Sequence, residues 1–378
     1  MLNLLSSGLV FVLLTLAGAT QAADCGTATG GMAAPAPALV PPPDKALRTA
    51  IDDYRAIAKA GGWQAVPPGL KLETGAQGLR VLALARRLSM TGDLARAQYQ
   101  SGAPSDRFDE SLAAAVKHFQ QRHGLAVDGV VGPATLRELN VPVAARIETL
   151  ALNLPRIERE QAAWGDRYLM VNAASATYRL VDGGQILFDR PAIVGRATWQ
   201  TPQLDGVIER LDFNPYWTVP PRIANLEIFP IIRREQNYLA RHHMHFVNGQ
   251  IRQDPGPDNP LGVVKFFFEN PYNVYLHDTN NRTLFARPER FFSHGCVRIA
   301  EPLDLARYLL AGDPAWPEGR IDEVVASGGN LQVHLRTGLP VHIVYRTSWV
   351  DADGTVQFRR DVYGRDHGEG SAPRSAEP

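Results

Sequence analysis

The chain has 378 residues, which exceeds what one ordinary hydrophobic core holds, so we expect about two or three domains. Lysine plus arginine and aspartate plus glutamate number 39 each, and the formal net charge is therefore zero. This balance gives no electrostatic reason to expect a nucleic-acid partner, and the apolar fraction of 45% is typical of a soluble globular chain.

The first residues predict export. An apolar run over residues 8–17 is followed by a small-residue stretch at 19–23, which together have the pattern of a secretory signal peptide over 1–23. The run is too short for a permanent bilayer span, so cleavage would leave no stable membrane span. No lysine or arginine precedes the run, and an uncleaved amino-terminal anchor is the alternative.

Two cysteines occur in the chain, Cys25 and Cys296. In an oxidising compartment such a pair invites a disulfide, but a bridge would silence Cys296. A lipid-modified Cys25 fits poorly with Asp24 directly before it, where a small residue is expected. We therefore interpret Cys25 as incidental and Cys296 as a free thiol.

The amino-terminal half is predicted to be helical. Residues 24–43 are rich in alanine, glycine and proline and form a tether, and 44–70 form a helical linker with Asp44 as the helix N-cap. Residues 71–142 carry two amphipathic helices and form a small helical domain, and 143–165 form a further helical scaffold.

Strand patterns dominate from 166 to 347. Asp182-Gly183-Gly184 between two β-rich runs predicts a hairpin. The predicted strands are 168–171, 176–181, 185–194, 207–213, 262–268, 274–277 and 341–347. Residues 218–258 form a less regular insertion, and 348–378 a C-terminal hairpin followed by a disordered tail after Gly364.

Cys296 is the candidate nucleophile. A thiol attacks as its thiolate, so it needs an imidazole within reach, held in one tautomer by a third group. His294 lies two residues before it, on the same face of an extended segment, and His277 lies nineteen residues upstream beside Asp278. Gly295 permits a tight turn and leaves main-chain amides free to stabilise an oxyanion. Spacing alone favours His294 as the base.

Two other interpretations of these residues remain. Cys296 could be a buried structural cysteine. The histidines of Arg241-His242-His243-Met244-His245, together with Cys296, invite a zinc peptidase hypothesis, but they lack the spacing of a common zinc motif. We expect a solvated surface there, with no metal and no cofactor.

The helical domain contains Phe119-Gln120, Asp128-Gly129 and Gly132-Pro133-Ala134-Thr135. This run resembles the peptidoglycan-binding domain of wall enzymes, a three-helix bundle. Gly129 allows a tight turn, and Pro133 can begin the last helix because the first helical position needs no amide donor. A helical packing domain with no ligand is the alternative.

The segment Tyr275-Leu276-His277-Asp278, followed by Ser293-His294-Gly295-Cys296-Val297-Arg298, resembles the signature of YkuD-type L,D-transpeptidases. Together with the helical domain, the resemblance points to the long YcbB-like periplasmic subgroup. It implies a multidomain α+β protein: a small three-helix peptidoglycan-binding bundle and a mostly β catalytic domain in which the 218–258 insertion acts as a lid.

The family resemblance implies a role for each residue of the signature. Cys296 would attack a stem-peptide carbonyl, with His277 as general acid and base oriented by the main-chain carbonyl of Asp278. His294 would support the thiol, and the amides of Gly295 and Cys296 would form the oxyanion hole.

Four further residues are expected at the substrate. Arg298 would hold a substrate carboxylate with its planar bidentate donors. Ser293, Tyr275 and Trp217 would also contact substrate.

The resemblance also implies the substrates and partners. Peptidoglycan stem peptides would be donor and acceptor in the formation of 3→3 cross-links, and carbapenems would acylate Cys296. Water or a lipoprotein amine as acceptor, or a scaffold without activity, are the alternatives.

Overall fold

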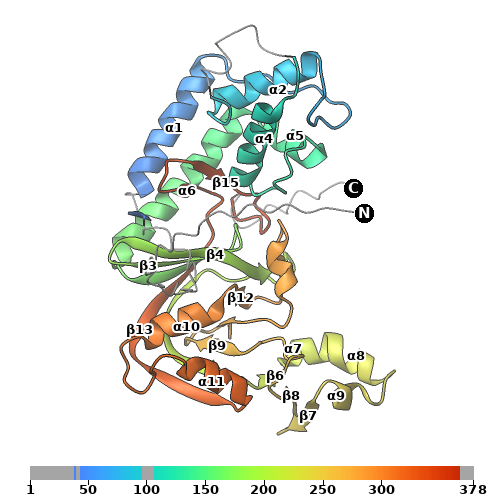
Figure 1. Ribbon diagram of the computed structural model, residues 1–378, viewed down its shortest axis with the longest axis vertical. Coiled ribbons are helices and arrows are strands. Elements are labelled where there is room, and N and C mark those ends of the chain that lie inside the picture. Colours follow the sequence, from blue (N-terminus) through green and yellow to red (C-terminus); the bar gives the residue numbers. More distant parts are fainter. Residues whose placement is uncertain (1–37, 40–42, 96–105, 367–378) are drawn as a thin grey trace, which may run out of the picture. The chain divides into compact units, whose positions relative to one another are not determined.

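The computed structural model describes residues 38–39, 43–95 and 106–366 (Figure 1). The predicted signal peptide, most of the predicted tether and Cys25 lie outside the described residues. Within residues 38–39, 43–95 and 106–366, no helix combines the length and the apolar character that a bilayer crossing requires.

A first hydrophobic core joins an early helix of the chain to a late hairpin. Helix α1 (Pro43–Lys59) packs against helix α6 (Val143–Ala163), and the hairpin of β14 (Ser348–Val350) and β15 (Val356–Phe358) completes the cluster. Its fully or nearly buried side chains are Leu47, Ala50, Ile51, Tyr54, Leu150, Ile157, Val350 and Phe358. Full burial of a leucine or phenylalanine stabilises the fold by about 1.5–3 kcal/mol.

Helix α1 begins one residue earlier than predicted. Pro43 is its first residue, and Asp44 lies in the first turn instead of at the N-cap. A carboxylate in the first turn is still favourable, because it faces the positive end of the helix dipole.

The small helical domain contains α2 (Leu79–Met90), α4 (Glu110–Arg122) and α5 (Pro133–Leu139). Asp109 caps α4, since its carboxylate accepts a hydrogen bond of 2.9 Å from Leu112 N–H. Pro133 is the first residue of α5, as predicted. The core includes Val66, Val81, Leu84, Leu88, Phe108, Val116, Phe119 and Leu139.

Gln120 forms hydrogen bonds with several residues of the helical motif. Its side chain is 1% exposed, donates to Asp128 Oδ1 (2.7 Å) and Val130 O (2.9 Å), and accepts from Gly129 N–H (2.8 Å). Gly129 has a φ of +76°, which favours glycine. These motif residues therefore hold the turn before α5 together, whatever the domain binds.

The region from Tyr168 to Val344 is built on one large sheet. Its strands are β1 (Ala38–Leu39), β2 (Tyr168–Asn172), β3 (Thr177–Asp182), β4 (Gln185–Gly195), β5 (Leu204–Phe213), β9 (Val264–Phe267), β10 (Leu276–His277), β11 (Phe291–Ser293), β12 (Val297–Ile299) and β13 (Leu331–Val344). The order is β1-β4-β12-β10-β9-β5-β13-β2-β3, β11 pairs with β4, and an additional β3–β4 pairing closes the path.

The predicted hairpin is present between β3 and β4. Asp182 pairs with Gln185, and both turn glycines, Gly183 and Gly184, have positive φ (57° and 74°). A two-residue turn of this kind matches the twist of the flanking strands. Strand β13 begins ten residues before the predicted start at 341 and pairs along much of β5.

Helices α10 (Pro302–Leu310) and α11 (Arg320–Ser327) lie against the sheet near β13 (Figure 1). They contribute Leu305, Ala306, Leu310, Ile321 and Val324 to the main core. A short 3-10 helix, η2 (Arg282–Ala286), lies between β10 and β11.

The insertion has a regular structure of its own. It contains β6 (Trp217–Thr218), α7 (Pro221–Ile223), the π-helix η1 (Ala224–Ile228), α8 (Phe229–Ile232), α9 (Tyr238–Arg241), β7 (Met244–Val247) and β8 (Gln250–Gln253). The three strands form a small sheet in the order β6-β8-β7. Its separate core consists of Val219, Ile223, Ala224, Ile228, Met244 and Ile251.

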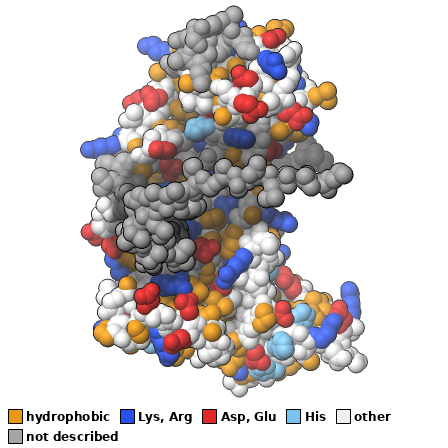
Figure 2. Space-filling view, viewed as in Figure 1, with side chains coloured by type: hydrophobic (Ala, Val, Ile, Leu, Met, Phe, Trp, Pro, Cys, Tyr) orange, Lys and Arg blue, Asp and Glu red, His pale blue; other side chains and the backbone are white. Residues whose placement is uncertain are grey.

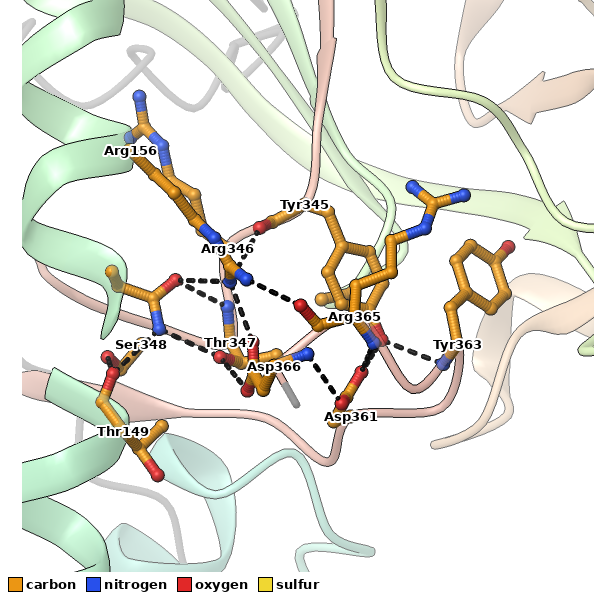
Figure 3. A network of polar contacts seen from close by, with 12 residues as sticks. Thr149, Arg156, Tyr345, Arg346, Thr347, Ser348, Asp361, Tyr363, Arg365 and Asp366 are labelled. Carbon is orange, nitrogen blue, oxygen red and sulfur yellow. Dashed lines mark hydrogen bonds and ion pairs between the residues drawn. The ribbon is translucent and has the colours of Figure 1, made fainter. Parts of the chain in front are cut away.

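After the hairpin, the C-terminal segment folds back onto Tyr345, the residue that follows β13 (Figure 3). Tyr345 Oη donates to Asp361 Oδ1 (2.7 Å) and accepts from Tyr363 N–H (2.8 Å). Asp366 accepts hydrogen bonds from Arg156 of α6 (2.7 Å) and Thr347 (2.6 Å). The predicted disordered tail begins after Gly364, but these bonds give Arg365 and Asp366 fixed positions; the rest of the predicted tail lies outside the described residues.

Candidate active site

The turn between β11 and β12 carries the predicted nucleophile. Cys296 has a free thiol and directly precedes β12. Ser293 Oγ donates to the Cys296 carbonyl and accepts from Gly295 N–H at 3.1 Å. Gly295 has a φ of +115°, a conformation that favours glycine. The tight turn is therefore present as predicted.

Two expectations about this turn need correction. Ser293 was expected to contact substrate, but it is 2% exposed and its hydroxyl is used inside the turn. The Gly295 amide was expected in the oxyanion hole, yet it already donates to Ser293 Oγ. Among the described residues no main-chain acceptor faces Cys296 N–H, which leaves this amide available.

Strand register brings the two motif segments together. β10 and β12 are parallel neighbours, with Leu276 opposite Val297 and His277 opposite Arg298. Leu276 and Val297 are fully buried in the core. Side chains alternate along a strand, so His277 and Arg298, which follow this pair, face the opposite side of the sheet. Tyr275 and Cys296, which precede the same pair, face that side too.

His277 is held in one tautomer. Its Nδ1 lies 2.6 Å from the carbonyl oxygen of Asp278, and a carbonyl can only accept, so Nδ1 carries the proton. Burial lowers the pKa of His277 to about 3, and the charges of Arg298 and Lys265 act in the same direction. The ring is therefore neutral near pH 7, with Nε2 free to take up a proton.

Asp278 anchors the end of β10 in two ways. In addition to its carbonyl contact with His277, its buried carboxylate accepts from Val263 N–H (3.0 Å) and Arg282 (3.1 Å). A Cβ atom at Gly262 would lie 2.4 Å from Asp278 Oδ2, so the carboxylate packs directly on that glycine. The orientation of His277 thus has rigid support.

The surroundings of the Cys296 thiol have opposing effects on its pKa. Burial raises the pKa of Cys296, whereas a hydrogen bond from the Tyr275 main chain and the charges of Lys265 and Arg298 favour the thiolate. The net shift is upward, so the resting pair is a protonated thiol and a neutral imidazole.

A row of ionisable side chains crosses the sheet beside the thiol. Asp212 on β5 pairs with Lys265 on β9, Lys265 with His277, and His277 with Arg298. Lys265 Nζ lies 3.7 Å from the centroid of the Tyr275 ring, and burial lowers the pKa of Lys265. Asp212 and Lys265 were not among the predicted site residues, because only the register of β5 and β9 brings them here.

Arg298 has unused donor capacity. Its Nε is buried and has no hydrogen-bond partner among the described residues. Burial lowers the pKa of Arg298, with the Cys296 thiolate opposing this, yet a guanidinium remains charged at neutral pH. An unpartnered buried donor beside the thiol fits a carboxylate ligand.

His294 points to the insertion. Its Nε2 lies 2.6 Å from Glu227 Oε1 on η1, and Glu227 also accepts from Arg196 at 3.1 Å. The His294 ring meets Trp199 edge-on, with centroids 4.7 Å apart. Spacing alone favoured His294 as base, but this geometry gives it a supporting position between the nucleophile turn and the insertion.

Tyr275 and Trp217 differ in their distance from the chemistry. The Tyr275 ring stacks on Phe267 at 5.4 Å and shares the sheet face with Cys296, so it borders the thiol. Trp217 pairs with Gln253 and packs against the apolar cluster of the insertion, which gives it a role in anchoring that segment.

The histidines of the insertion gather on the face shown in Figure 2. His242 and His245 are half-buried and His243 is exposed. In the stretches that the structure describes, no group of three His, Cys, Asp or Glu side chains is arranged to hold a metal ion.

Two family models match this chain. The model of the YkuD L,D-transpeptidase catalytic domain matches residues 166–317, which include His277 and Cys296. The chain carries an L,D-transpeptidase catalytic domain. A second model, "Putative peptidoglycan binding domain", matches residues 87–139 in the helical domain. The chain is thus a multidomain α+β protein with a helical module beside a mostly β YkuD-type domain.

Individual relatives are more distant. A curated "Putative L,D-transpeptidase" of Haemophilus influenzae is 30% identical over 219 residues, which cover 52% of this chain and 44% of that protein. The crystal structure of an L,D-transpeptidase from Stackebrandtia nassauensis is 15% identical, with a TM-score of 0.29 over 74% of this chain and 95% of that one. An L,D-transpeptidase from Mycobacterium smegmatis is 12% identical, with a TM-score of 0.28 over 47% and 58% of the two chains.

Proposed function

We propose that this protein is a peptidoglycan L,D-transpeptidase that works through a thioester on Cys296. The family match over residues 166–317 supports the activity class. The observation that carries the mechanism is the register of β10 and β12, which aligns His277 beside the Cys296 segment while Nδ1 is bonded to the Asp278 carbonyl. Nucleophilic acyl transfer needs a base that can take the thiol proton, and a neutral imidazole on the strand beside the Cys296 segment can supply it.

In the first half-reaction, Cys296 Sγ attacks the carbonyl of the L-centre of diaminopimelate in a tetrapeptide stem. His277 Nε2 takes the thiol proton, and the oxyanion forms beside the free Cys296 N–H. Collapse breaks the C–N bond, and His277 returns the proton to the leaving amine of D-alanine. The product is a thioester between Cys296 and the shortened stem.

In the second half-reaction, the side-chain amine of another diaminopimelate attacks the thioester and loses its proton to His277. The C–S bond breaks, and the thiolate is reprotonated. The product is a 3→3 cross-link. Arg298, with its unpartnered buried Nε, would hold a carboxylate of the stem.

The cellular setting of the reaction is part of the proposal. The apolar run at 8–17 and the peptidoglycan-related domains support export to the periplasm, where the helical module would bind the wall. Membership of the long YcbB-like subgroup is proposed on the combination of helical module and insertion. We propose carbapenems as inhibitors, because a strained β-lactam carbonyl is a target for the same thiol.

The test is mass analysis of muropeptides after purified protein is mixed with wall that bears tetrapeptide stems. Dimers with 3→3 links are the expected product. Tripeptides alone would identify water as the acceptor and make the protein an L,D-carboxypeptidase, whereas a product with a lipoprotein amine would identify that acceptor. Absence of every product would overturn the proposal in favour of a scaffold.

A further inference from the structure

A loop with two buried end residues contacts the nucleophile turn. It follows β4 and spans Gly195 to Thr201, and Arg196 N–H donates to Ser293 O at 3.0 Å. Thr201 is fully buried, and its hydroxyl accepts from Gly195 N–H (2.9 Å) while donating to Gly295 O (2.8 Å). A Cβ atom at Gly195 would lie 2.0 Å from Trp199 O, so this close packing requires glycine.

The Thr201–Gly295 hydrogen bond holds the peptide unit that contains Cys296 N–H. The carbonyl of Gly295 and the N–H of Cys296 belong to one planar trans peptide unit and point in opposite directions. A hydroxyl that holds the carbonyl on the Thr201 side therefore aims the Cys296 N–H at the other side. Gly295 N–H is occupied by Ser293, so Cys296 N–H is the amide that this turn has left for an oxyanion.

The C-terminal segment holds this loop in turn. Tyr363 is 6% exposed, and its hydroxyl donates to Gly195 O at 2.6 Å and accepts from Thr201 N–H at 3.4 Å. Gln200 donates to Tyr363 O (3.2 Å), and Arg365 donates to Thr201 O (3.0 Å). The loop thus meets the C-terminal segment through both main-chain and side-chain groups.

The C-terminal segment is itself anchored. The rings of Tyr345 and Tyr363 stack at 5.2 Å, and Asp361 accepts from Tyr345 Oη and from the N–H groups of Arg365 and Asp366 (Figure 3). Asp366 also pairs with Arg156 of α6. The support of the loop therefore extends from the nucleophile turn to the first core.

We infer that Thr201 and Tyr363 are positioning residues that set the Gly295–Cys296 peptide so that Cys296 N–H receives the developing oxyanion. The inference rests on the proposed function. Neither residue touches substrate: Thr201 acts through Gly295, and Tyr363 acts through Thr201 and Gly195.

The experiment compares variants of the full chain that keep side-chain volume. Thr201→Val removes the hydroxyl, Thr201→Ser retains it, and Tyr363→Phe removes only the phenolic oxygen. Tyr308→Phe is the matched control, because its hydroxyl bonds to Asp182 and contacts no residue of the nucleophile turn. Two rates are measured: acylation of Cys296 by a tetrapeptide stem in a single turnover, and alkylation of Cys296 by iodoacetamide.

Alkylation forms no oxyanion, so it separates positioning from general damage. Loss of one oxyanion donor costs about 10²–10³ in rate. In Thr201→Val the Cys296 amide would be misdirected but not lost, so we expect the acylation rate to fall roughly ten- to a hundredfold while the alkylation rate stays unchanged. Tyr363→Phe should lose acylation to a smaller extent, and Thr201→Ser and Tyr308→Phe should acylate at the wild-type rate.

Two results would overturn the inference alone. Wild-type acylation by Thr201→Val would show that the hydroxyl does not aim the amide, and a parallel fall of acylation, alkylation and melting temperature would show a structural role. If wild-type protein is alkylated normally but is acylated by no tetrapeptide stem, the proposed function itself fails, and the inference fails with it.

Discussion

His277 Nδ1 lies 2.6 Å from the main-chain carbonyl oxygen of Asp278, a contact between sequence neighbours that fixes both the ring orientation and the tautomer. The same ring is 4% exposed and faces the positive charges of Arg298 and Lys265. A histidine in these surroundings stays neutral well below pH 7, which has consequences for stability and for catalysis.

The first consequence is an acid-dependent loss of stability. Unfolded His277 binds a proton as the pH falls through about 6.5, whereas folded His277 does so only near 3, so lowering the pH favours the unfolded state. Between pH 7 and pH 5 this should cost about 2 kcal/mol of unfolding free energy. Denaturant titrations should show a shallower acid loss for His277→Gln than for wild type.

His118 provides a control of opposite sign. Its hydrogen bond to Asp93 raises the pKa of His118, so this histidine stabilises the fold at low pH and the effect fades as the pH rises. His118→Gln should therefore steepen the acid loss. Identical pH profiles for His277→Gln and wild type would contradict the neutral buried imidazole.

Lys265 should govern the reactivity of the thiol. Its charge favours the Cys296 thiolate, so Lys265→Met should raise the pKa of the thiol and slow iodoacetamide alkylation at pH 8 by roughly threefold or more. Lys265→Arg keeps the charge and should alkylate close to the wild-type rate. Equal rates for the Met and wild-type proteins would exclude this electrostatic link.

Glu227 should fasten the insertion to the nucleophile turn. Glu227→Ala removes the acceptor of both His294 and Arg196, so amides of η1 and α8 should exchange hydrogen faster, with little change in melting temperature because exposed ion pairs contribute about 0–1 kcal/mol. The matched control is Glu235→Ala, whose partner Arg241 lies within the insertion itself. Unchanged exchange in Glu227→Ala would mean that other contacts hold the insertion.

A carbapenem should add to Cys296 with its whole mass. The thiol opens the β-lactam ring without releasing a leaving group, so the intact protein should gain one drug mass. Cys296→Ala should gain none, because no other group in the turn is a comparable nucleophile. A drug adduct on the Ala variant would place the nucleophile elsewhere.

The local features of the site followed from sequence because they depend on near neighbours. The Gly183-Gly184 pair predicted the hairpin, because glycine tolerates the positive φ angles that such a turn requires, and Gly295 predicted the tight turn before Cys296. The family signature identified His277, nineteen residues before Cys296, as the base, whereas spacing alone favoured His294.

The remainder of the site depends on register and could not be predicted. Lys265 lies near the thiol only because β9 pairs with β10 in this alignment, and Asp212 lies beside Lys265 because β5 pairs with β9. The sequence suggested that the Gly295 amide is free, but in the structure Gly295 N–H donates to the side-chain hydroxyl of Ser293. Tyr363 lies in a segment with no strand or helix pattern, so nothing in its neighbourhood indicated a contact with Gly195.

The most direct test is to trap and locate the acyl-enzyme. Full-length protein is mixed with a tetrapeptide stem without acceptor, quenched in acid and digested, and the peptide that carries the added tripeptide mass is sequenced by mass spectrometry. The account predicts a thioester on Cys296, with much slower formation in His277→Gln. An acyl group on any other residue, or undiminished acylation of Cys296→Ala, would contradict it.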